Sequence, residues 1–366
     1  MPMTVAALRE TAAGERRVAI TPEVAKKLRG KGLRVLLEHD AGTAAGFPDS
    51  SYADVEFADA GSVLAQADVF TCVLPPDDSV WARLREGTLV VGQLRPYGAP
   101  SRIVAMGKQR LTAFALELLP RTTRAQAMDV LSSQAAVAGY RAMLIAAEAA
   151  PKFFPMLTTA AGTIRPSRVL VIGAGVAGLQ AIATARRLGA QTEGYDVRPE
   201  TREQVESMGA KFLDLGVSAA GSGGYARELS VEERAAQQQA LAEHLKAVDV
   251  IVTTAAVPGR PSPKILTTAM IEGMKPAALI VDLAAEGGGN CELTKPGERV
   301  EHNGVVILGP LNLPAGAALH ASEMYARNVY NFVELLVQGD ALVPDFNDEL
   351  IAKSCVTRNG EPHFQG

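Results

Sequence analysis

The sequence has few cysteines, few aromatic residues and no block of like charges. Cys72, Cys291 and Cys355 are its three thiols, and they lie far apart without a CxxC pair. This spacing excludes a disulfide framework and is typical of a reducing compartment. The 36 basic and 40 acidic side chains among 366 residues give a net charge of −4. Without a basic block, nucleic acid is not expected as a partner, and no metal site is predicted.

The sequence also lacks the patterns of a leader and of a membrane span. Its start has no positively charged segment followed by an apolar core, so no signal peptide is predicted. The most apolar stretches are 135–150 and 169–185; the first carries Arg141 and Glu148, and the second is interrupted by glycines. Neither predicts a membrane span. With 48% hydrophobic and 21% charged residues, the chain is predicted to be globular and cytoplasmic.

Short apolar runs alternate with helical patterns along the whole chain, which indicates parallel sheets covered by helices. Helices are predicted at 21–32 and 322–339. Strands are predicted at 34–39, 69–74, 88–94, 112–119, 168–172, 192–197, 249–255, 278–284 and 305–308. The expected fold class is α/β, with two Rossmann-like, doubly wound parallel-sheet domains separated by a cleft.

The domain boundaries are predicted from the point where this rhythm restarts. A helix over about 127–150 marks the first boundary, and the last helix of the chain is expected to return to the first domain. The N-terminal domain is therefore predicted to be discontinuous, comprising 1–132 and 322–366, with the second domain at 133–321. The tail after 340 is expected to form a hairpin packed on the first domain or on a second subunit.

A glycine-rich motif, GAGVAG at 173–178, follows the strand RVLVI and opens a helical pattern. Asp196 ends the next strand, 21 residues after Gly175 (196 − 175). This context predicts a dinucleotide site, in which the acidic side chain binds ribose hydroxyls and favours NAD over NADP. Arg198 is a counter-signal, because an arginine can bind the 2′-phosphate of NADP. The alternative is a glycine-rich packing turn without a ligand.

A second group of polar residues precedes this motif. Gln126, Asp129 and Ser132 recur every three residues and share one face if the stretch is helical, and Arg121 lies just ahead. Arginine binds phosphates or carboxylates, and Gln and Ser can hydrogen-bond a carboxamide. A carboxylate stabilises the positive charge of an oxidised nicotinamide, but none of the four is an evident proton acceptor. The alternative is that they are only the polar face and caps of a helix.

The shortage of proton acceptors bears on the reaction. An enzyme that oxidises a hydroxyl or an amine with NAD needs a general base, and His320 is the only plausible base among the five histidines. Its alternative is a helix-start histidine without chemistry. Hydride transfer between two nicotinamides needs no base. The protein has only to hold the two rings about 3–3.5 Å apart. A dehydrogenase using His320 and a non-catalytic NAD sensor remain as the other hypotheses.

Seven stretches resemble the NAD(H)-binding component of the proton-translocating nicotinamide nucleotide transhydrogenase, and the resemblance covers essentially the whole chain. They are 120–142, 152–164, 169–190, 194–198, 223–228, 283–294 and 353–360. The resemblance implies a homodimer at the cytoplasmic face of the inner membrane, held there by NADP(H)-binding and membrane-spanning partner subunits. It implies an AB-specific (Si-Re) hydride transfer from its NAD(H) to NADP(H) on the partner, coupled to proton translocation.

The resemblance also implies a role for individual residues. The nicotinamide-side loop falls on Arg121, Gln126, Asp129 and Ser132, and the pyrophosphate turn on Ala174, Gly175 and Val176. The ribose site falls on Asp196, Val197 and Arg198, the mobile loop on Gly224 and Tyr225, and the adenine side on Gln237 and Ala256.

Alanine dehydrogenases share the stretches 15–23 and 41–52. Their catalytic lysine would fall at Leu74 and their catalytic histidine at Arg95. Since neither proton-handling side chain is present, an amino-acid dehydrogenase is not expected. The chain stops without a membrane span, which resembles the split form of the transhydrogenase with a separate soluble subunit.

Overall fold

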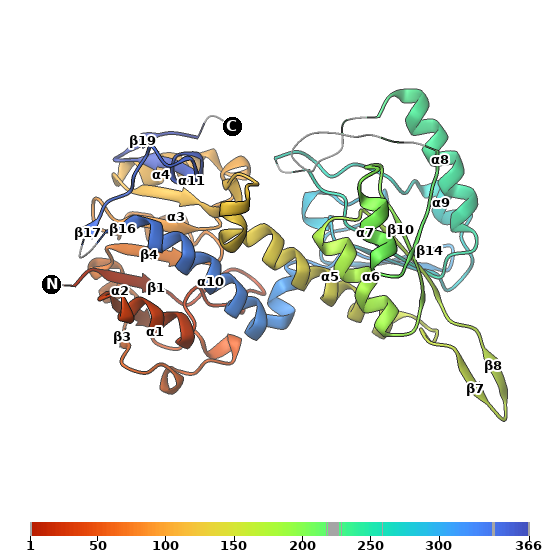
Figure 1. Ribbon diagram of the computed structural model, residues 1–366, viewed down its shortest axis with the longest axis horizontal. Coiled ribbons are helices and arrows are strands. Elements are labelled where there is room, and N and C mark those ends of the chain that lie inside the picture. The colour runs from red at the N-terminus through yellow and green to blue at the C-terminus, as the bar shows by residue number, and fades with distance from the viewer. Residues whose placement is uncertain are drawn as a thin grey trace. The chain divides into compact units, whose positions relative to one another are not determined.

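The computed structural model describes residues 2–216, 218, 227, 229–257, 259–338 and 341–364. The chain divides into two compact units (Figure 1): unit 1 comprises Met1–Gln134 and Pro314–Gly366, and unit 2 comprises Ala135–Leu313. The boundaries expected from the sequence, after 132 and 321, differ from these by two residues (134 − 132) and eight residues (321 − 313). That each unit folds as an independent domain stays a prediction.

Unit 1 contains an eight-stranded sheet in the order β19-β18-β6-β5-β4-β1-β2-β3. The strands are β1 (Thr4–Ala7), β2 (Arg34–Glu38), β3 (Glu56–Ala58), β4 (Val69–Cys72), β5 (Leu89–Gly92), β6 (Thr112–Ala115), β18 (Cys355–Arg358) and β19 (Glu361–Pro362). β1 to β6 are parallel, and β18 joins β6 in the antiparallel sense. The tail therefore extends the sheet of unit 1, the first of the two expected placements.

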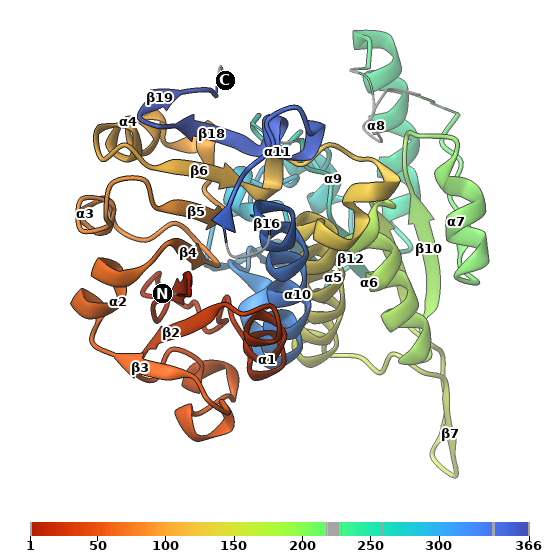
Figure 2. The ribbon, with the colours of Figure 1, turned by 60° about the vertical axis from the view of Figure 1, so that its left-hand side comes forward.

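Helices cover both faces of this sheet (Figure 2). They are α1 (Pro22–Gly30), α2 (Ala60–Gln66), α3 (Asp78–Trp81), α4 (Pro100–Lys108), α10 (Ala318–Leu336) and α11 (Glu349–Ser354). Successive strand residues face opposite ways, so Val5 packs with α1 and α10, and Ala6 packs with α2, α3 and α4. Apolar side chains on both faces explain why these strands read as continuous apolar runs.

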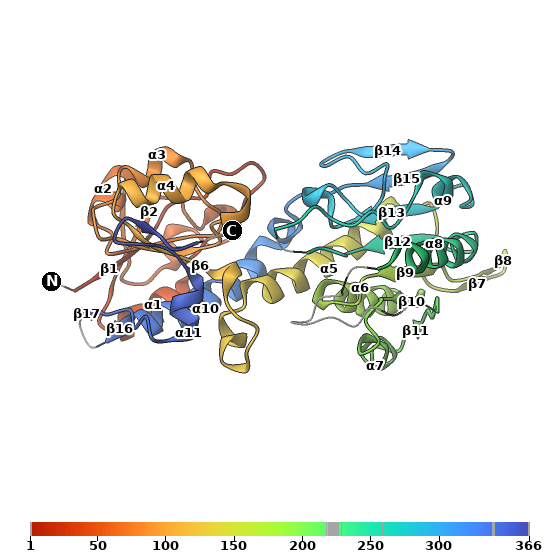
Figure 3. The same ribbon diagram turned by 90° about the horizontal axis from the view of Figure 1, so that it is seen from above.

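Unit 2 repeats the same plan. Its seven-stranded sheet has the order β11-β10-β9-β12-β13-β15-β14 (Figure 3). The strands are β9 (Arg168–Ile172), β10 (Gln191–Tyr195), β11 (Lys211–Phe212), β12 (Val250–Thr253), β13 (Leu279–Asp282), β14 (Arg299–His302) and β15 (Val305–Leu308). Within this sheet, only β14 is antiparallel to its neighbour. Each unit thus has six parallel strands in the doubly wound order 3-2-1-4-5-6, and the predicted fold class is confirmed.

The helices of unit 2 also lie on both faces of its sheet. They are α5 (Val130–Ala149), which includes the boundary between the units, α6 (Val176–Arg187), α7 (Thr201–Ser207), α8 (Val231–Leu245) and α9 (Thr268–Glu272). By length and composition alone, α5 could cross a membrane, and 39% of its most apolar window is buried. Core helices meet the same criteria, and Ala142, Met143 and Ala146 of α5 belong to the core of unit 2.

Short connections complete the chain. The 3-10 turns are η1 (Thr43–Ala45), η2 (Asp49–Ser51), η3 (Pro96–Gly98), η4 (Leu116–Leu118), η5 (Thr123–Met128), η6 (Ala285–Gly287) and η7 (Leu313–Ala317). β16 (Val337–Gln338) pairs with β17 (Ala341–Leu342). β7 (Leu157–Thr159) and β8 (Gly162–Ile164) form a hairpin that extends from unit 2 (Figure 1), and all six strand residues are exposed.

Most predicted elements agree with the structure to within about two residues at each end, and three differ by more. The helix expected from about 127 begins at Val130, because Asp129 leaves the helical conformation (ψ 91°) after the 3-10 turn η5. The strand expected over 112–119 ends at Ala115, where the 3-10 turn η4 begins. The last helix begins at Ala318, four residues (322 − 318) before the predicted start.

Two helices of unit 2 approach closely at a glycine. A Cβ atom built on Gly139 of α5 would lie 2.0 Å from the carbonyl oxygen of Ala177 in α6. No flexible side chain can yield there, because the obstacle is a backbone atom. Gly139 therefore permits the contact between the helix that leads out of unit 1 and the helix that follows the glycine-rich turn.

We expect Gly139→Ala to lower the free energy of unfolding by about 1–3 kcal/mol, since the extra methyl forces α5 and α6 apart. Urea unfolding followed by circular dichroism measures this change. Gly30→Ala is the matched control, because a Cβ there has no neighbour within 4 Å and alanine is the better helix former. Equal stability of the two variants would contradict the close approach.

Candidate functional site

The glycine-rich turn of unit 2 lies where ligands usually bind in an open α/β sheet. Residues 173–175 connect the carboxyl end of β9 to α6. β9 lies between β10 and β12, so the chain winds to opposite sides of the sheet from this strand. Such a switch point leaves a crevice beyond the carboxyl ends of the strands. The motif found in the sequence is therefore at the position that a dinucleotide site requires.

The three glycines of this turn have different roles. Gly173 has a positive φ of 97°, and its Cβ would lie 2.5 Å from Oγ1 of Thr254. A Cβ on Gly178 would lie 1.8 Å from the carbonyl oxygen of Gly173. Gly175 differs, because its Cβ would meet only a guanidinium nitrogen of Arg198, at 4.0 Å. Two glycines are thus required by packing, and the middle one faces open space, where a ligand can approach the backbone.

The N-terminus of α6 fits an anion at this turn. Gly175 occupies the N-cap position, and no side chain caps the helix. The first N–H groups of any helix have no partner within the helix, and the helix dipole places partial positive charge there. A pyrophosphate is the type of anion that such a terminus binds. The residues present at Ala174, Gly175 and Val176 therefore fit a dinucleotide.

Asp196 and Arg198 form a compact pair beyond β10. Arg198 donates from Nη2 to Oδ2 of Asp196 at 2.7 Å and from Nε to Oδ1 at 2.9 Å. The backbone N–H of Ala174 donates to Oδ2 at 2.8 Å. The pair offsets the acidic charge on which the sequence-based preference for NAD depends, so that preference stays a prediction. The same ion pair engages Arg198, the residue that favoured NADP in the sequence.

The remaining residues expected at the adenosine end lie in different surroundings. Gln237 on α8 is buried and donates from Nε2 to the hydroxyl of Tyr195 at 2.7 Å. Ala256 is exposed after β12, and Val197 is half-buried. Gly224 and Tyr225, expected in a mobile loop, lie outside the described residues.

Unit 1 contains a cavity of about 330 Å³ at the start of α5. All four residues of the predicted nicotinamide-side loop line it, namely Arg121, Gln126, Asp129 and Ser132. Gln126 lies on the 3-10 turn η5, Asp129 at the junction and Ser132 in the first turn of α5. The expectation of one helical face was therefore wrong, but the chain still brings the four side chains to one cavity.

Asp129 has a structural role beside any chemical one. Its Oδ1 accepts the backbone N–H of Ser132 at 2.9 Å, and its Oδ2 accepts the hydroxyl of Ser132 at 2.6 Å. The carboxylate thus caps the N-terminus of α5. A helix cap was the alternative role considered for this residue in the sequence. A cap and a ligand contact are compatible, because each carboxylate oxygen has two lone pairs.

Sequence reasoning missed Glu117, which lines the same cavity. Its Oε1 accepts the backbone N–H of Arg95 at 2.5 Å, whereas its enclosed Oε2 has no hydrogen-bond partner among the described residues. Burial raises the pKa of this carboxyl above its ordinary value. The available signal was a single acidic residue in the apolar run TAFALELL.

The positions where alanine dehydrogenases carry proton-handling groups provide none here. Leu74 is 8% exposed and belongs to the apolar core of unit 1. Arg95 is exposed, with a left-handed φ of 49°. His320 lies in the first turn of α10 and lines a second cavity of unit 1 with Arg16 and Thr43, among others. None of the four nicotinamide-side residues lines that second cavity.

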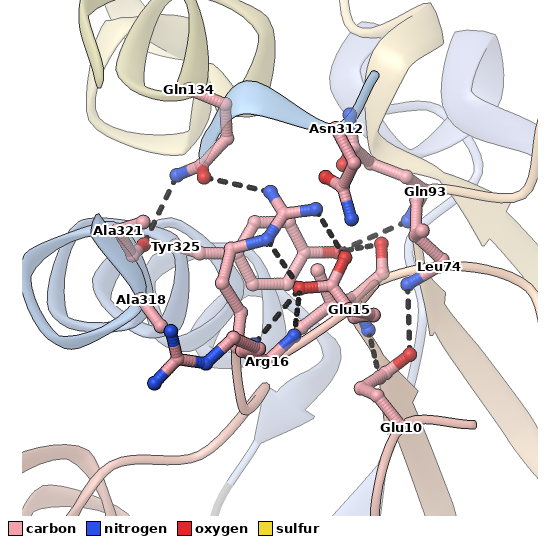
Figure 4. A network of polar contacts seen from close by, with 12 residues as sticks. Glu10, Glu15, Arg16, Leu74, Gln93, Gln134, Asn312, Ala318, Ala321 and Tyr325 are labelled. Atoms are coloured by element: carbon pink, nitrogen blue, oxygen red, sulfur yellow. Dashed lines mark hydrogen bonds and ion pairs between the residues drawn. The ribbon is translucent and has the colours of Figure 1, made fainter. Parts of the chain in front are cut away.

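Buried side chains of unit 1 also form a polar network (Figure 4). Arg17 donates from Nη2 to Oε2 of Glu15 at 2.6 Å and from Nη1 to Oε1 of Gln134 at 2.8 Å. Gln134 in turn donates to the carbonyl oxygen of Ala321 at 3.1 Å. Nearby, Glu10 accepts the backbone N–H of Leu74 at 3.2 Å, and burial raises the pKa of Glu10 to about 8. The network connects the loop after β1 with α5 and α10.

Among the described residues, no group of three or more His, Cys, Asp or Glu side chains could hold a metal ion.

The sequence matches known nucleotide-dependent enzymes over nearly its whole length. The family models for the alanine dehydrogenase/PNT N-terminal and C-terminal domains match residues 6–138 and 142–365. A relative from Rhodospirillum rubrum, the first part of an NAD(P) transhydrogenase subunit alpha, is 44% identical over 98% of this chain and 97% of its own length.

Solved structures give the same result. A transhydrogenase from Sinorhizobium meliloti is 42% identical with a TM-score of 0.90, over 98% of this chain and 99% of the other. An L-alanine dehydrogenase shares the fold, with 23% identity, a TM-score of 0.82 and coverage of 98% and 96%. The chain therefore belongs to the family of NAD(P) transhydrogenase alpha subunits, within the wider alanine dehydrogenase/PNT family.

Proposed function

We propose that this protein is the NAD(H)-binding subunit of a proton-translocating transhydrogenase. It transfers hydride directly between its own NAD(H) and NADP(H) on a partner subunit, and membrane-spanning subunits couple that step to proton translocation. The observation that carries the proposal is the cavity of unit 1, which gathers Arg121, Gln126, Asp129 and Ser132 in a chain 44% identical to a transhydrogenase alpha subunit.

The proposed binding roles follow from the chemistry of each group. In unit 2, the backbone at Ala174, Gly175 and Val176 binds the pyrophosphate, and Asp196, Val197 and Arg198 bind the ribose. Gln237 and Ala256 contact the adenine, and Gly224 and Tyr225 belong to a loop that closes over the nucleotide. In unit 1, Gln126 and Ser132 hydrogen-bond the carboxamide, Arg121 binds a phosphate, and Asp129 stabilises the positive charge of the oxidised ring.

The replacement of the dehydrogenase acid–base groups supports hydride exchange over dehydrogenation. Bound NAD(H) supplies a C–H bond that is broken or formed with its electron pair, and no O–H or N–H bond of a substrate changes. The chain then has only to hold the ring in position and exclude water. Leu74, buried in the core, and His320, which lines a cavity without the loop residues, agree with this requirement.

The remaining parts of the proposal concern assembly. The subunit binds at the cytoplasmic face of the inner membrane through NADP(H)-binding and membrane-spanning partners, and it is AB-specific. It forms a homodimer, to which the β7–β8 hairpin contributes. An isolated two-stranded hairpin is only marginally stable in water, and Met156, Leu157 and Ile164 beside or within this one are 65%, 37% and 44% exposed.

The first experiment is cyclic hydride transfer in the presence of an NADP(H)-binding transhydrogenase domain. NADH reduces an NAD analogue through the NADP(H) of the partner, and we expect fast turnover only with both proteins. Asp129→Asn keeps the helix cap, whereas Asp129→Ala removes it and lowers stability by about 1 kcal/mol. We expect both variants to slow turnover by about tenfold or more, equivalent to ~1.4 kcal/mol.

This pair separates the two roles of Asp129. If the carboxylate only caps α5, Asp129→Asn will turn over like the wild type. Tight NADH binding without partner-dependent turnover would instead favour the NAD sensor, and turnover of a small substrate without a partner would favour a dehydrogenase that uses His320.

For the pyrophosphate turn, we expect Gly175→Ala to weaken NADH binding by about tenfold or more, since the methyl occupies the space of the ligand. The free energy of unfolding should fall by no more than about 1 kcal/mol, because that Cβ has no close protein neighbour and φ is −79°, although alanine is a poorer N-cap residue than glycine. Fluorescence titration with NADH and urea unfolding test the two parts. Wild-type affinity in Gly175→Ala would mean that no ligand approaches this backbone.

For the hairpin, we expect Met156→Asp with Leu157→Asp to convert a dimer to a monomer, because charges would be buried at the interface. Light scattering after size-exclusion chromatography measures the mass. Val231→Asp is the control, since Val231 of α8 is 81% exposed outside the hairpin. A double variant that stays dimeric would exclude the hairpin as a main contact.

A further inference from the structure

Glu117 is the one carboxyl of the unit 1 cavity whose second oxygen makes no hydrogen bond among the described residues. Oε1 is fixed by the backbone N–H of Arg95, and Oε2 is enclosed without a partner. Asp129, the other carboxyl of the cavity, has a hydrogen bond from Ser132 on each oxygen. An enclosed oxygen without a donor disfavours the charged form of the group. A cation placed in the cavity would reverse that preference.

We infer that Glu117 is an electrostatic partner of the oxidised nicotinamide, ionised when NAD⁺ is bound and neutral when NADH is bound. The inference rests on the proposed placement of the nicotinamide in this cavity and deepens it. NAD⁺ carries a positive charge on its ring, whereas the reduced ring is neutral. A carboxyl that lines the cavity therefore distinguishes the two oxidation states by charge alone.

Glu117 shares two neighbours, Cys72 and Tyr325, with a second buried carboxyl, Glu10. Because burial raises the pKa of Glu10 to about 8, the Glu117→Gln variant is needed to assign the response to Glu117. Backbone N–H groups of Glu117, Arg95 and Leu94 partly oppose the effect of burial on the pKa of Glu117, and so does the charge of Arg95, in the loop after β5. The Cys72 thiol on β4 and the Tyr325 hydroxyl on α10 also face it, and burial raises the pKa of both well above their ordinary values. Both are neutral at physiological pH. Arg121 and Asp129 complete the charged lining of the cavity.

The coupling balances charge during the proposed reaction. Glu117 loses its O–H proton to solvent as the hydride passes, with its electron pair, to NADP⁺ on the partner. One positive charge appears on the ring and one negative charge on the carboxyl, so the net charge of the cavity stays the same. In the reverse direction Glu117 takes a proton from solvent. Glu117 acts on the ring through its charge and makes no bond to the transferred hydride.

The sign of the pH dependence follows from the raised pKa of Glu117 in the free protein. Above that pKa the carboxylate is already present, and NAD⁺ binds with full affinity. As the pH falls below it, NAD⁺ must displace a proton, and its Kd rises until Glu117 is protonated in the complex as well. An opposite charge nearby lowers a carboxyl pKa by about 1–3 units. NADH has no ring charge, so its Kd should not follow this dependence.

The test compares NAD⁺ and NADH binding to the full chain between about pH 5 and about pH 8, a range above the usual pKa of glutamate. We expect the Kd of NAD⁺ to fall by about tenfold or more across this range in the wild type. Binding of NAD⁺ in weak buffer should also release protons that an indicator dye detects. In Glu117→Gln both effects should be lost, while NADH affinity stays within about twofold.

Two further variants make the result specific. Glu117→Asp keeps an ionisable group and should keep proton release, which also covers the case that Glu117→Gln does not fold. Glu86→Gln changes an exposed carboxylate paired with Arg110 in the same unit and should behave like the wild type.

The outcomes distinguish this inference from the proposed function. If NAD⁺ and NADH bind but proton release is the same in the wild type and Glu117→Gln, or absent from both, the role of Glu117 is overturned and the function stands. If neither nucleotide binds to the wild type, the proposed function fails, and this inference fails with it.

Discussion

The buried ion pair of Arg17 and Glu15 is the interaction on which the arrangement of the unit 1 cavity depends. The two side chains are 3% and 0% exposed, so each charge requires the other and its hydrogen bonds. Arg17 also holds Gln134, which lies two residues (134 − 132) after Ser132 on α5. The cavity residues Asp129 and Ser132 therefore lie at the start of α5, and Arg17, in the loop after β1, holds this end of the helix through Gln134. Loss of either charge would remove this ion pair from the buried network.

The two units use the same strand order for different purposes. In unit 2 the switch point between β9 and β12 carries a glycine turn, with open space beside Gly175. In unit 1 the equivalent point lies between β1 and β4, and there Glu10 accepts the backbone N–H groups of Val73 and Leu74. A carboxyl in this position occupies the place that an anion would need. The glycine turn of unit 2 thus fits a nucleotide, whereas the equivalent point of unit 1 is occupied by a carboxyl.

Among the described residues, the lining of the unit 1 cavity that contains Asp129 includes no histidine and no lysine. Leu74 and Arg95 stand where a dehydrogenase of the same fold needs a lysine and a histidine, and His320 lines a separate cavity. The ionisable groups that line this cavity, among the described residues, are two carboxyls and an arginine. In the proposed hydride exchange, such groups stabilise or destabilise charge and make no bond to the transferred hydrogen. Such a set of groups suits the proposed reaction, which moves a hydride and changes the charge of the nicotinamide ring.

The sequence by itself determined the fold class, because apolar runs with turn residues between them specify buried parallel strands, and it located the glycine turn by its context. The residue pattern singled out the four loop residues, and the resemblance supplied their expected roles. Only the tertiary structure decided that they share one cavity through a 3-10 turn, that Arg198 pairs with Asp196, and that β18 joins β6. It alone identified Glu117, whose surroundings come from β4, the loop after β5 and α10. Burial and partner geometry depend on segments far apart in the chain, which local patterns do not encode.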